Sequence, residues 1–507
     1  MLARPTTAVL VLALIIPVTQ GQAADRRGMD STAAVPCSSA DDCPVLTLDD
    51  VRRRVLRTSP SARANRLEGR RAAARLLGAR GGFDPTFESG YEYKTQDGKD
   101  KLNVLRSGVE WPLNLPLSPS LTVDYRRGLG ASVDPSVATS RVGETRVGVS
   151  FAPLSGSRTD KSRAAFDKAQ LEPRRADAVQ ARKRNRLLLK VSRAYWDWVK
   201  ARRTLTVSRD LLGLAERRQA LITQEARAGE APAVDSIDAA RITASRQAEV
   251  DEAVRAVQEK RIKLATFLWD EDGSATAFRF APPAPEMPPP LDTTRRSAAV
   301  ERALARRPTL RVMDVKRQQT QIDQRLAQEQ LRPKLKLEAQ AVSYTKRPTN
   351  VSDVKVGLKI EQPLFLRGRR SEAERADIAR RNLDLKQDIA ERQVRADVES
   401  ALAAVTQARR RVESARRNEQ LAEKLQRAEQ ERFEQGQGTL FVLNKREQTL
   451  AKARKQVIAA ETSAFKAYAT YQWATGTIAD AYTIADAYVD GGFSGERDRP
   501  RPSSASK

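Results

Sequence analysis

Residues 371–435 read SEAERADIARRNLDLKQDIAERQVRADVESALAAVTQARRRVESARRNEQLAEKLQRAEQERFEQ and contain neither glycine nor proline. Small apolar residues recur there in alternating steps of four and three, at Val394, Val398, Ala401, Val405, Ala408, Val412 and Ala415. That spacing is typical of a coiled-coil seam. At about 1.5 Å per residue, the stretch predicts a helix roughly 98 Å long that packs closely against a partner. A simple two-helix coiled coil is the plainer interpretation, and the spacing alone leaves it open.

The chain contains two copies of one pattern. Local sequences agree between the copies, as in VGVSFAPL at 147–154 and VGLKIEQPL at 356–364. The matched pairs are Pro60 and Pro308, Pro85 and Pro333, Gly148 and Gly357, Gly229 and Gly436, and Trp269 and Trp473. Their shift falls from about 248 to about 209 residues, which places an insertion of roughly 39 residues between Tyr93 and Val147. Because solenoid repeats are about 20–50 residues long, the duplication predicts two copies of one large unit.

Each copy reads as a short helix, strands, a long helix, a tight turn and a second shorter helix. The expected helices are 49–81, 160–228 and 235–269 in the first copy, and 297–331, 371–435 and 439–475 in the second. In each copy the two shorter helices together match the long one in length. We therefore expect each copy to form two parallel rods of about 100 Å, one continuous and one built from two stacked helices.

The expected strands alternate apolar and charged residues. Segments 87–93, 147–151, 335–341 and 354–360 each place apolar residues on one face and charged residues on the opposite face. A soluble sandwich would cover the apolar face with a second layer, whereas a membrane barrel would turn it toward lipid. The export signal described below favours the barrel. Since two strands per copy cannot close a barrel, and open edges in lipid leave backbone groups unpaired, we expect a homo-oligomer with one shared barrel.

Composition excludes several classes of function. The 507 residues carry 90 Lys and Arg against 64 Asp and Glu, a net charge of +26, yet the basic residues are interspersed with acids and form no recognition motif. We interpret them as a solvated helix surface and expect no nucleic-acid partner. The chain has no histidine, which removes the commonest general base and the commonest metal ligand. Its two cysteines cannot build a thiolate zinc site. We predict no enzyme activity and no catalytic, cofactor or metal site.

The two ends and the middle of the chain differ from the repeats. Residues 1–24 have the charged start, apolar stretch and small-residue cleavage site of a secretory signal, and 25–46 form an N-terminal extension. In an exported chain Cys37 and Cys43 fit a small disulfide loop, with free thiols or a lipidated cysteine as the alternatives. A Pro-rich linker at 271–296 separates the repeats, and 477–507 form a polar tail.

This order of segments, and the residues at its joints, resemble the TolC-like outer-membrane efflux protein family. The resemblance runs through a first repeat at 47–270 and a second at 297–476. In the first repeat, strands at about 83–151 precede a long hairpin at 160–269; in the second, strands at about 333–362 precede a hairpin at 371–475. The motifs are Thr47-Leu48-Asp49 with Pro60, Phe83-Asp84-Pro85, Gln362-Pro363-Leu364 with Gly368, Gly436-Gln437-Gly438-Thr439-Leu440 and Trp473-Ala474-Thr475-Gly476.

The resemblance implies a fold and a function. The fold is an α+β membrane protein, in which duplicated coiled-coil hairpins build an α-barrel tunnel and a homotrimer shares a transmembrane β-barrel of twelve strands, four from each chain. The implied function is a passive exit duct in the lipid of a Gram-negative outer membrane, with a long periplasmic extension. Its implied partners are a periplasmic adaptor protein and an inner-membrane transporter, in a tripartite efflux pump or a type I secretion system. No chemistry or cofactor is implied.

Two features depart from the family pattern. The insertion at about 101–140 holds further alternating segments, and it is either an extra hairpin outside the barrel or a source of added strands. After the second-repeat turn, residues 442–445 read VLNK, so the aspartates that form a gate in some relatives are missing there. Asp235 and Asp238 follow the first-repeat turn instead, and we interpret Asp235 as a charge that complements a helix dipole.

The two helix–helix turns are the candidate functional sites. Gly229 and Gly436 suit the left-handed residue that ends a helix, and Gly438 and Thr439 are the expected adaptor contacts, although Thr439 could merely cap the next helix. The residues flanking the second turn are gate candidates: Arg432, Phe433, Leu440 and Asn444. The rival hypothesis is an exported coiled-coil adaptor or surface stalk without its own channel. The sequence does not identify the exported substrate.

Overall fold

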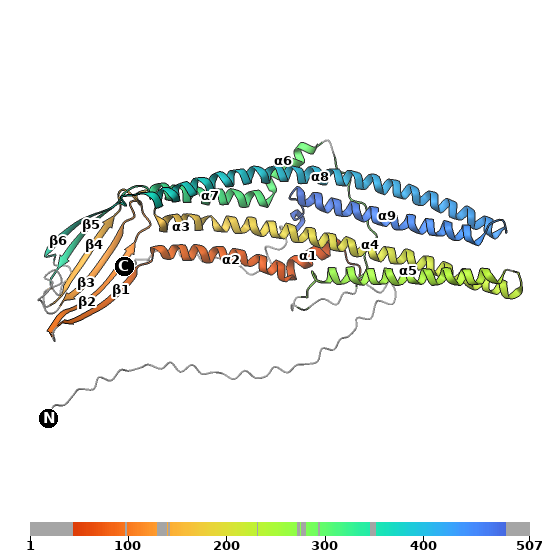
Figure 1. The fold of residues 1–507 in the computed structure, drawn as a ribbon, viewed down its shortest axis with the longest axis horizontal. Coiled ribbons are helices and arrows are strands. Elements are labelled where there is room, and N and C mark those ends of the chain that lie inside the picture. The colour runs from red at the N-terminus through yellow and green to blue at the C-terminus, as the bar shows by residue number, and fades with distance from the viewer. Residues whose placement is uncertain are drawn as a thin grey trace, which may run out of the picture.

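The computed structural model describes residues 44–96, 99–128, 139, 142–230, 232–270, 274, 280–292, 295–344 and 351–482. The expected signal segment, Cys37, Cys43 and most of the C-terminal tail lie outside these residues. The described part is elongated, with a β-sheet at one end and bundled long helices running away from it (Figure 1). This architecture confirms the predicted fold class of long helical hairpins joined to a strand domain.

The helices occupy most of the described chain. In the first repeat they are α1 (Leu48–Thr58), α2 (Pro60–Arg80), the short 3-10 helix η1 (Gly81–Phe83), α3 (Lys161–Gln170), α4 (Glu172–Ala228) and α5 (Ala233–Ala265). In the second they are α6 (Arg296–Arg306), α7 (Pro308–Glu329), α8 (Arg367–Glu434) and α9 (Leu440–Ala474), followed by η4 (Asp480–Tyr482). Figure 1 shows α7 and α9 following one another along α8, and α2 and α5 along α3 and α4.

Three predicted helices are split by proline. Pro60, Pro173 and Pro308 each stand in the first turn of a new helix, at the starts of α2, α4 and α7. The prediction of unbroken helices at 49–81, 160–228 and 297–331 is therefore wrong at these points. Proline has no N–H and its ring clashes with the preceding turn, so it is tolerated at a helix start and interrupts a helix interior.

The seam read from the sequence packs as expected. Val394, Val398, Ala401, Val405, Ala408 and Val412 of α8 are all buried. The first three lie in a cluster with Ala299 and Ala303 of α6, and Ala408 and Val412 contact Ala464 of α9. Small side chains let the backbones approach closely, so one seam on α8 serves two partner helices in succession.

An apolar belt at mid-length joins the repeats. Val51 and Val55 of α1, Tyr195 and Trp198 of α4 and Leu264 of α5 are almost completely buried in one cluster. Phe465 of α9 enters the same cluster and stacks on Trp196 with ring centroids 3.8 Å apart. The segment between the repeats also adds to it, because Val45 forms a parallel bridge with Ala281 and Met287 packs against the cluster. The repeats therefore form one body.

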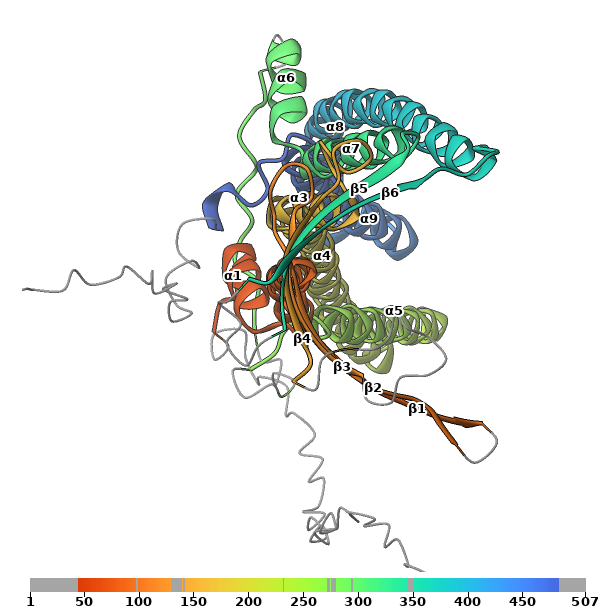
Figure 2. The ribbon, with the colours of Figure 1, turned by 90° about the vertical axis from the view of Figure 1, so that its left-hand side faces the viewer.

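The strands form one antiparallel sheet. They are β1 (Thr86–Gln96), β2 (Lys99–Pro112), β3 (Ser120–Gly128), β4 (Glu144–Phe151), β5 (Lys334–Ser343) and β6 (Asp353–Glu361), paired in chain order β1-β2-β3-β4-β5-β6. The insertion in the first repeat thus adds β2 and β3 to the sheet. The expectation of four strands per chain is wrong, since the described residues provide six. Figure 2 shows the sheet as an arc whose hollow side opens toward α5 and α9.

Two carboxylates, one half-buried and one buried, fasten the sheet to the helices. Asp160 accepts hydrogen bonds from the Arg163 backbone N–H at 2.9 Å and the Ser118 hydroxyl at 2.7 Å. Glu329 accepts from the Ser157 hydroxyl at 2.9 Å and the Arg158 backbone N–H at 3.2 Å. Burial raises the pKa of both carboxyls, but these hydrogen bonds and the nearby arginines outweigh it and hold each pKa below its ordinary value.

The sheet–helix junction should loosen in acid. A carboxyl whose pKa is lower in the folded state adds stability above its unfolded pKa of about 4, and that stability is lost as the pH falls through the lower folded value. Hydrogen-exchange mass spectrometry between pH 7 and pH 3 should therefore show protection at 113–119 and 154–160 falling below about pH 4. Asp160→Asn should reduce this acid dependence. An unchanged profile in that variant would contradict the role assigned to Asp160.

Candidate functional site: the two-faced sheet and the helix tips

One face of the sheet is apolar across all six strands. Paired residues in register share a face, as where Val109 of β2 lies opposite Val123 of β3 and Val123 opposite Val147 of β4. Large apolar side chains, many of them exposed, make up most of this face. They are Phe87, Tyr91, Tyr93, Leu105, Val109, Trp111, Leu121, Val123, Val147, Val149, Phe151, Leu337, Val354, Val356, Leu358 and Ile360.

The other face of the sheet carries charge. Its described side chains include acidic residues Glu88, Glu92, Glu110, Asp124, Glu144, Glu338, Asp353 and Glu361, and basic residues Lys94, Arg106, Arg126, Arg146, Lys334, Lys336, Lys355 and Lys359. The two signs are equally represented among them. This face suits contact with water and has no net preference for cations or anions.

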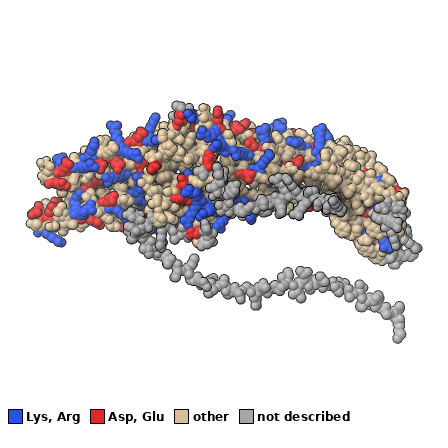
Figure 3. Space-filling view, turned by 180° about the vertical axis from the view of Figure 1, so that it is seen from behind, with Lys and Arg blue, Asp and Glu red and all other residues tan. Residues whose placement is uncertain are grey.

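The apolar face lies on the outer side of the arc. Figure 3 views the molecule from behind, and the surface over the sheet, at the right-hand end, is largely free of charged side chains. Both signs of charge cover the helices in the same view. An exposed apolar surface of this extent marks a contact with a membrane or another protein. None of the helices within the described residues is both long and apolar enough to span a membrane.

Both edges of the sheet lack a partner strand in the described chain. β1 pairs with β2 alone, and β6 pairs with β5 alone. Each edge therefore presents a row of backbone N–H and C=O groups that another strand could satisfy. Because strand direction alternates along the sheet, β6 of one copy would lie antiparallel to β1 of the next.

The far ends of the helices turn at the two predicted glycines. Gly229 and Gly436 have φ values of +81° and +73°. The backbone N–H groups of Gly229 and Glu230 donate to the carbonyls of Ala226 and Glu225, and those of Gly436 and Gln437 donate to Phe433 and Arg432. This pair of bonds is the Schellman pattern, which satisfies the last carbonyls of a helix and favours glycine. Both hairpins therefore end in the same kind of turn.

Gly438 and Thr439 have structural roles in the second turn. A Cβ added at Gly438 would lie 3.0 Å from the Phe433 backbone nitrogen, so the position favours glycine for space. The Thr439 hydroxyl accepts a hydrogen bond from the Val442 N–H at 3.4 Å and caps α9. In the first turn Pro232 stands before α5 and provides no side-chain cap. The two tips thus differ in sequence and in capping.

The four gate candidates do not lie in one environment. Arg432 is exposed, and Phe433 and Leu440 are half-buried beside the turn. Asn444 is buried one turn further along α9, where its Oδ1 accepts a hydrogen bond from Arg218 of α4 at 3.0 Å. The structure therefore brings Asn444 into a contact between the two hairpins and leaves Arg432 outside it.

Arg218 and Glu447 complete a buried cluster that the sequence analysis missed. The Arg218 guanidinium binds both carboxylate oxygens of Glu447, with Nη1 at 2.7 Å from Oε2. Both side chains are less than a tenth exposed. The residues lie 229 positions apart, so no local sequence pattern could predict that they pair. The sequence indicated only that each helix has a charged residue at a position facing inward. We call Arg218, Asn444 and Glu447 the inter-hairpin latch.

A second ionic contact lies further from the tips. The carboxylate of Glu461, on α9, is only 8% exposed and pairs with Arg203 of α4 at 2.6 Å and Arg416 of α8 at 2.7 Å. The Glu461 carboxylate is buried, whereas the side chains of Arg203 and Arg416 are 32% and 51% exposed, so both arginines reach this carboxylate from the solvent side. The first and second hairpins are thus held together at several levels along α4 and α9.

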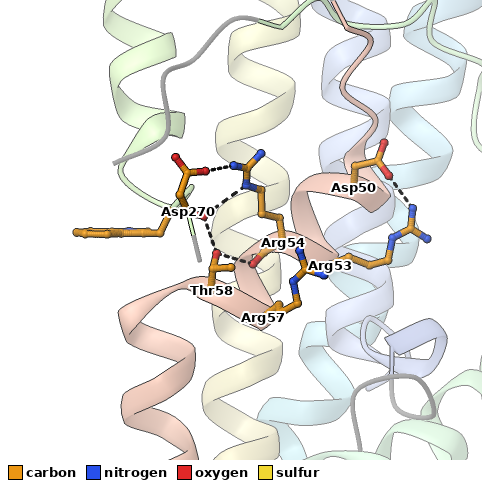
Figure 4. Close-up of a pocket in the computed structure, with 7 residues that line it drawn as sticks. Asp50, Arg53, Arg54, Arg57, Thr58 and Asp270 are labelled. Carbon is orange, nitrogen blue, oxygen red and sulfur yellow. Dashed lines mark hydrogen bonds and ion pairs between the residues drawn. The ribbon is translucent and has the colours of Figure 1, made fainter. Parts of the chain in front are cut away.

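The cavity in Figure 4 is a joint between helices. Arg54 of α1 pairs with Asp270, and Thr58 donates to the Trp269 carbonyl at 2.8 Å. Arg53 is engaged by Asp50 at 2.6 Å. The second repeat makes a similar joint, because Arg307 donates to the Trp473 carbonyl at 3.1 Å and stacks on that indole. The duplicated pattern favours a structural role over ligand binding.

Part of the chain matches a known protein family. Residues 299–477 match the family model described as outer membrane efflux protein. No curated protein matches the chain. Among solved structures, the Campylobacter jejuni outer membrane channel CmeC is 13% identical with a TM-score of 0.61, covering 85% of each chain.

Two further solved channels show the same fold. The outer membrane protein VceC from Vibrio cholerae is 14% identical with a TM-score of 0.63, covering 85% of this chain and 96% of its own. The Neisseria gonorrhoeae channel MtrE, solved in its open state, is 16% identical with a TM-score of 0.60, covering 85% and 88%. At these identities the likeness establishes the fold. The second repeat thus matches the outer membrane efflux protein family model, and 85% of the chain shares the fold of these outer-membrane proteins.

Proposed function

We propose that three copies of this chain form a passive exit duct through the outer membrane. The sheets close into one lipid-embedded barrel, and the helices form a tunnel that extends into the periplasm. The observation that carries the proposal is the six-stranded sheet with one apolar face, one charged face and two open edges. In lipid each unpaired backbone group costs several kcal/mol, so such a sheet is stable there only when neighbouring copies cover its edges.

The duct acts by geometry alone. Substrate enters at the helix tips, passes along the tunnel and leaves through the barrel, whose inward face carries both signs of charge in equal number among its described side chains. Energy and specificity come from an inner-membrane transporter, and a periplasmic adaptor joins that transporter to the tips. The assembly is a tripartite efflux pump or a type I secretion system. An adaptor or stalk has no use for an apolar outer face on a curved sheet, which disfavours that rival.

Detergent extraction and imaging test this function. We expect the protein in the outer-membrane fraction, extracted as a trimer with a hollow shaft of roughly 100 Å, the length of α8 at about 1.5 Å per residue. Size-exclusion chromatography with light scattering and negative-stain electron microscopy make the measurement. A monomer in detergent, or a solid rod, would end the proposal.

We expect the inter-hairpin latch to keep the tips closed. Glu447→Gln removes the charge that pairs with buried Arg218, and losing one partner of a buried pair costs about 3–5 kcal/mol. The second hairpin can then swing away from the first. Purified trimer in planar bilayers should show an open probability raised by about tenfold or more.

Two further variants test whether the inter-hairpin latch controls opening. Arg427→Gln breaks an ion pair with Glu423 that is solvent-exposed, 2.7 Å long and confined to α8, and it should leave the open probability unchanged. Asn444→Ala should raise conductance less than Glu447→Gln, because it removes one neutral partner. If Glu447→Gln behaves like Arg427→Gln, the latch does not control opening. If Arg432→Ala and Asn444→Ala both leave conductance and ion selectivity unchanged, the gate assignment at the second turn is wrong.

Exposed apolar side chains at the tips are the proposed adaptor contacts, together with the turns at Gly229, Gly436, Gly438 and Thr439. Val234 and Ile237 of α5 and Phe441 of α9 are each about two-thirds or more exposed. Phe441→Ser should weaken binding of the cognate adaptor by about tenfold or more, since a buried aromatic anchor contributes about 2 kcal/mol or more to an interface. Ile262→Ser, at an apolar position that is 61% exposed and lies at the other end of α5, is the control. Surface plasmon resonance with immobilised trimer gives the affinities; equal losses in both variants would argue against docking at the tips.

A further inference from the structure

We propose that the barrel of this protein has eighteen strands, six from each of three copies, and is as wide as the helical tunnel below it. The inference rests on the proposed function and goes beyond it, because the family pattern implies twelve. It assigns the first-repeat insertion to the wall of the pore.

The inserted strands have the same two faces as their neighbours. In β2 and β3 the residues Val109 and Val123 lie in register with Phe87 of β1 and Val147 of β4, and all four belong to the apolar face. On the charged face, Arg106 and Asp124 occupy the alternate positions of these strands. A hairpin standing in water outside the barrel has no need of a continuous apolar face. The pattern therefore places β2 and β3 in the same lipid layer as β5 and β6.

The inserted strands also lie inside the sheet. β2 and β3 are paired on both sides, and the edges of the sheet are β1 and β6. Removing the inserted hairpin from the wall would require breaking the β1–β2 and β3–β4 ladders, which run through 11 and seven residue pairs. The insertion is consequently a widening of the wall.

Six strands match the width of the helices they join. Next to the sheet each copy presents four helical rods, α2, α3, α7 and α8 (Figure 1). At about 10 Å per rod these occupy roughly 40 Å of circumference. A strand with a spacing of about 4.8 Å and a tilt of about 40° occupies about 6 Å, so six strands take up roughly 38 Å and four only roughly 25 Å. With six strands, barrel and tunnel meet without a step.

The wider wall changes what can leave. Barrel diameter grows roughly linearly with strand number, so eighteen strands give about one and a half times the diameter of twelve, and roughly twice the cross-section. Molecules that pass the tips and the tunnel then meet no narrower opening in the barrel wall. The inter-hairpin latch and the tips, which can move, set the size of the cargo.

Site-directed thiol labelling tests the placement of the inserted strands. Single cysteines replace Val109 or Val123 on the apolar face and Arg106 or Asp124 on the charged face, in full-length trimer carrying Cys37→Ser and Cys43→Ser. A charged, membrane-impermeant maleimide is applied to proteoliposomes. The charged-face positions should react at least about tenfold faster than the apolar-face positions, because lipid excludes a charged reagent. Val356→Cys and Lys355→Cys in β6 are the matched control pair.

The control pair separates the two hypotheses. If β6 shows the contrast and β2 and β3 react equally on both faces, the inserted hairpin lies in water; the eighteen-stranded barrel is then wrong and the duct stands. If β6 shows no contrast either, the membrane duct itself is wrong. Cryo-electron microscopy of the unaltered trimer in nanodiscs gives a second reading without substitutions. A barrel cross-section with twelve strands would overturn the inference, and one with eighteen would support it.

Discussion

In the proposed duct, every backbone N–H and C=O group that lies in lipid needs a hydrogen-bond partner. Within one copy the ladders satisfy β2 to β5 on both sides, and β1 and β6 keep one open edge each. The same sheet exposes a continuous apolar face that water does not favour. Both deficits are removed by the same event, the closure of several sheets into a barrel surrounded by lipid. In that proposal, oligomerisation is a condition for the stability of the strand domain.

The helical part solves a different problem, which is to hold long rods together without a thick core. Alanine and valine at the seam of α8 allow close packing, but they bury little apolar area per residue. The apolar belt around Trp198 provides the main cluster at mid-length. Nearer the tips, ion pairs to the buried carboxylates of Glu461 and Glu447 join the hairpins instead. Such pairs are specific in geometry and are strongly destabilised when one partner is removed, which suits the opening proposed for the tips.

The two repeats have diverged where their tasks differ. The first contributes four strands and ends its hairpin at Pro232, whereas the second contributes two strands and ends at Gly438 and Thr439. The joints between their helices remain alike, since the Trp269 carbonyl accepts a hydrogen bond from Thr58, at the end of α1, and the Trp473 carbonyl accepts one from Arg307, directly after α6. Divergence is therefore found at the sheet and the tips, and similarity at the joints that keep the rods in line.

The sequence by itself determined the features that depend on neighbours along the chain. The steps of four and three predicted the seam at Val398 and Val405, alternation predicted the two faces of the strands, and glycine predicted the left-handed turns at Gly229 and Gly436. The motifs at the joints indicated the family. Tertiary structure alone decided the contacts between distant segments: the pairing of Arg218 with Glu447, and the place of β2 and β3 between β1 and β4. Periodicity reports which side of an element is apolar, but many partners satisfy one apolar or charged side, and only the packed chain selects among them.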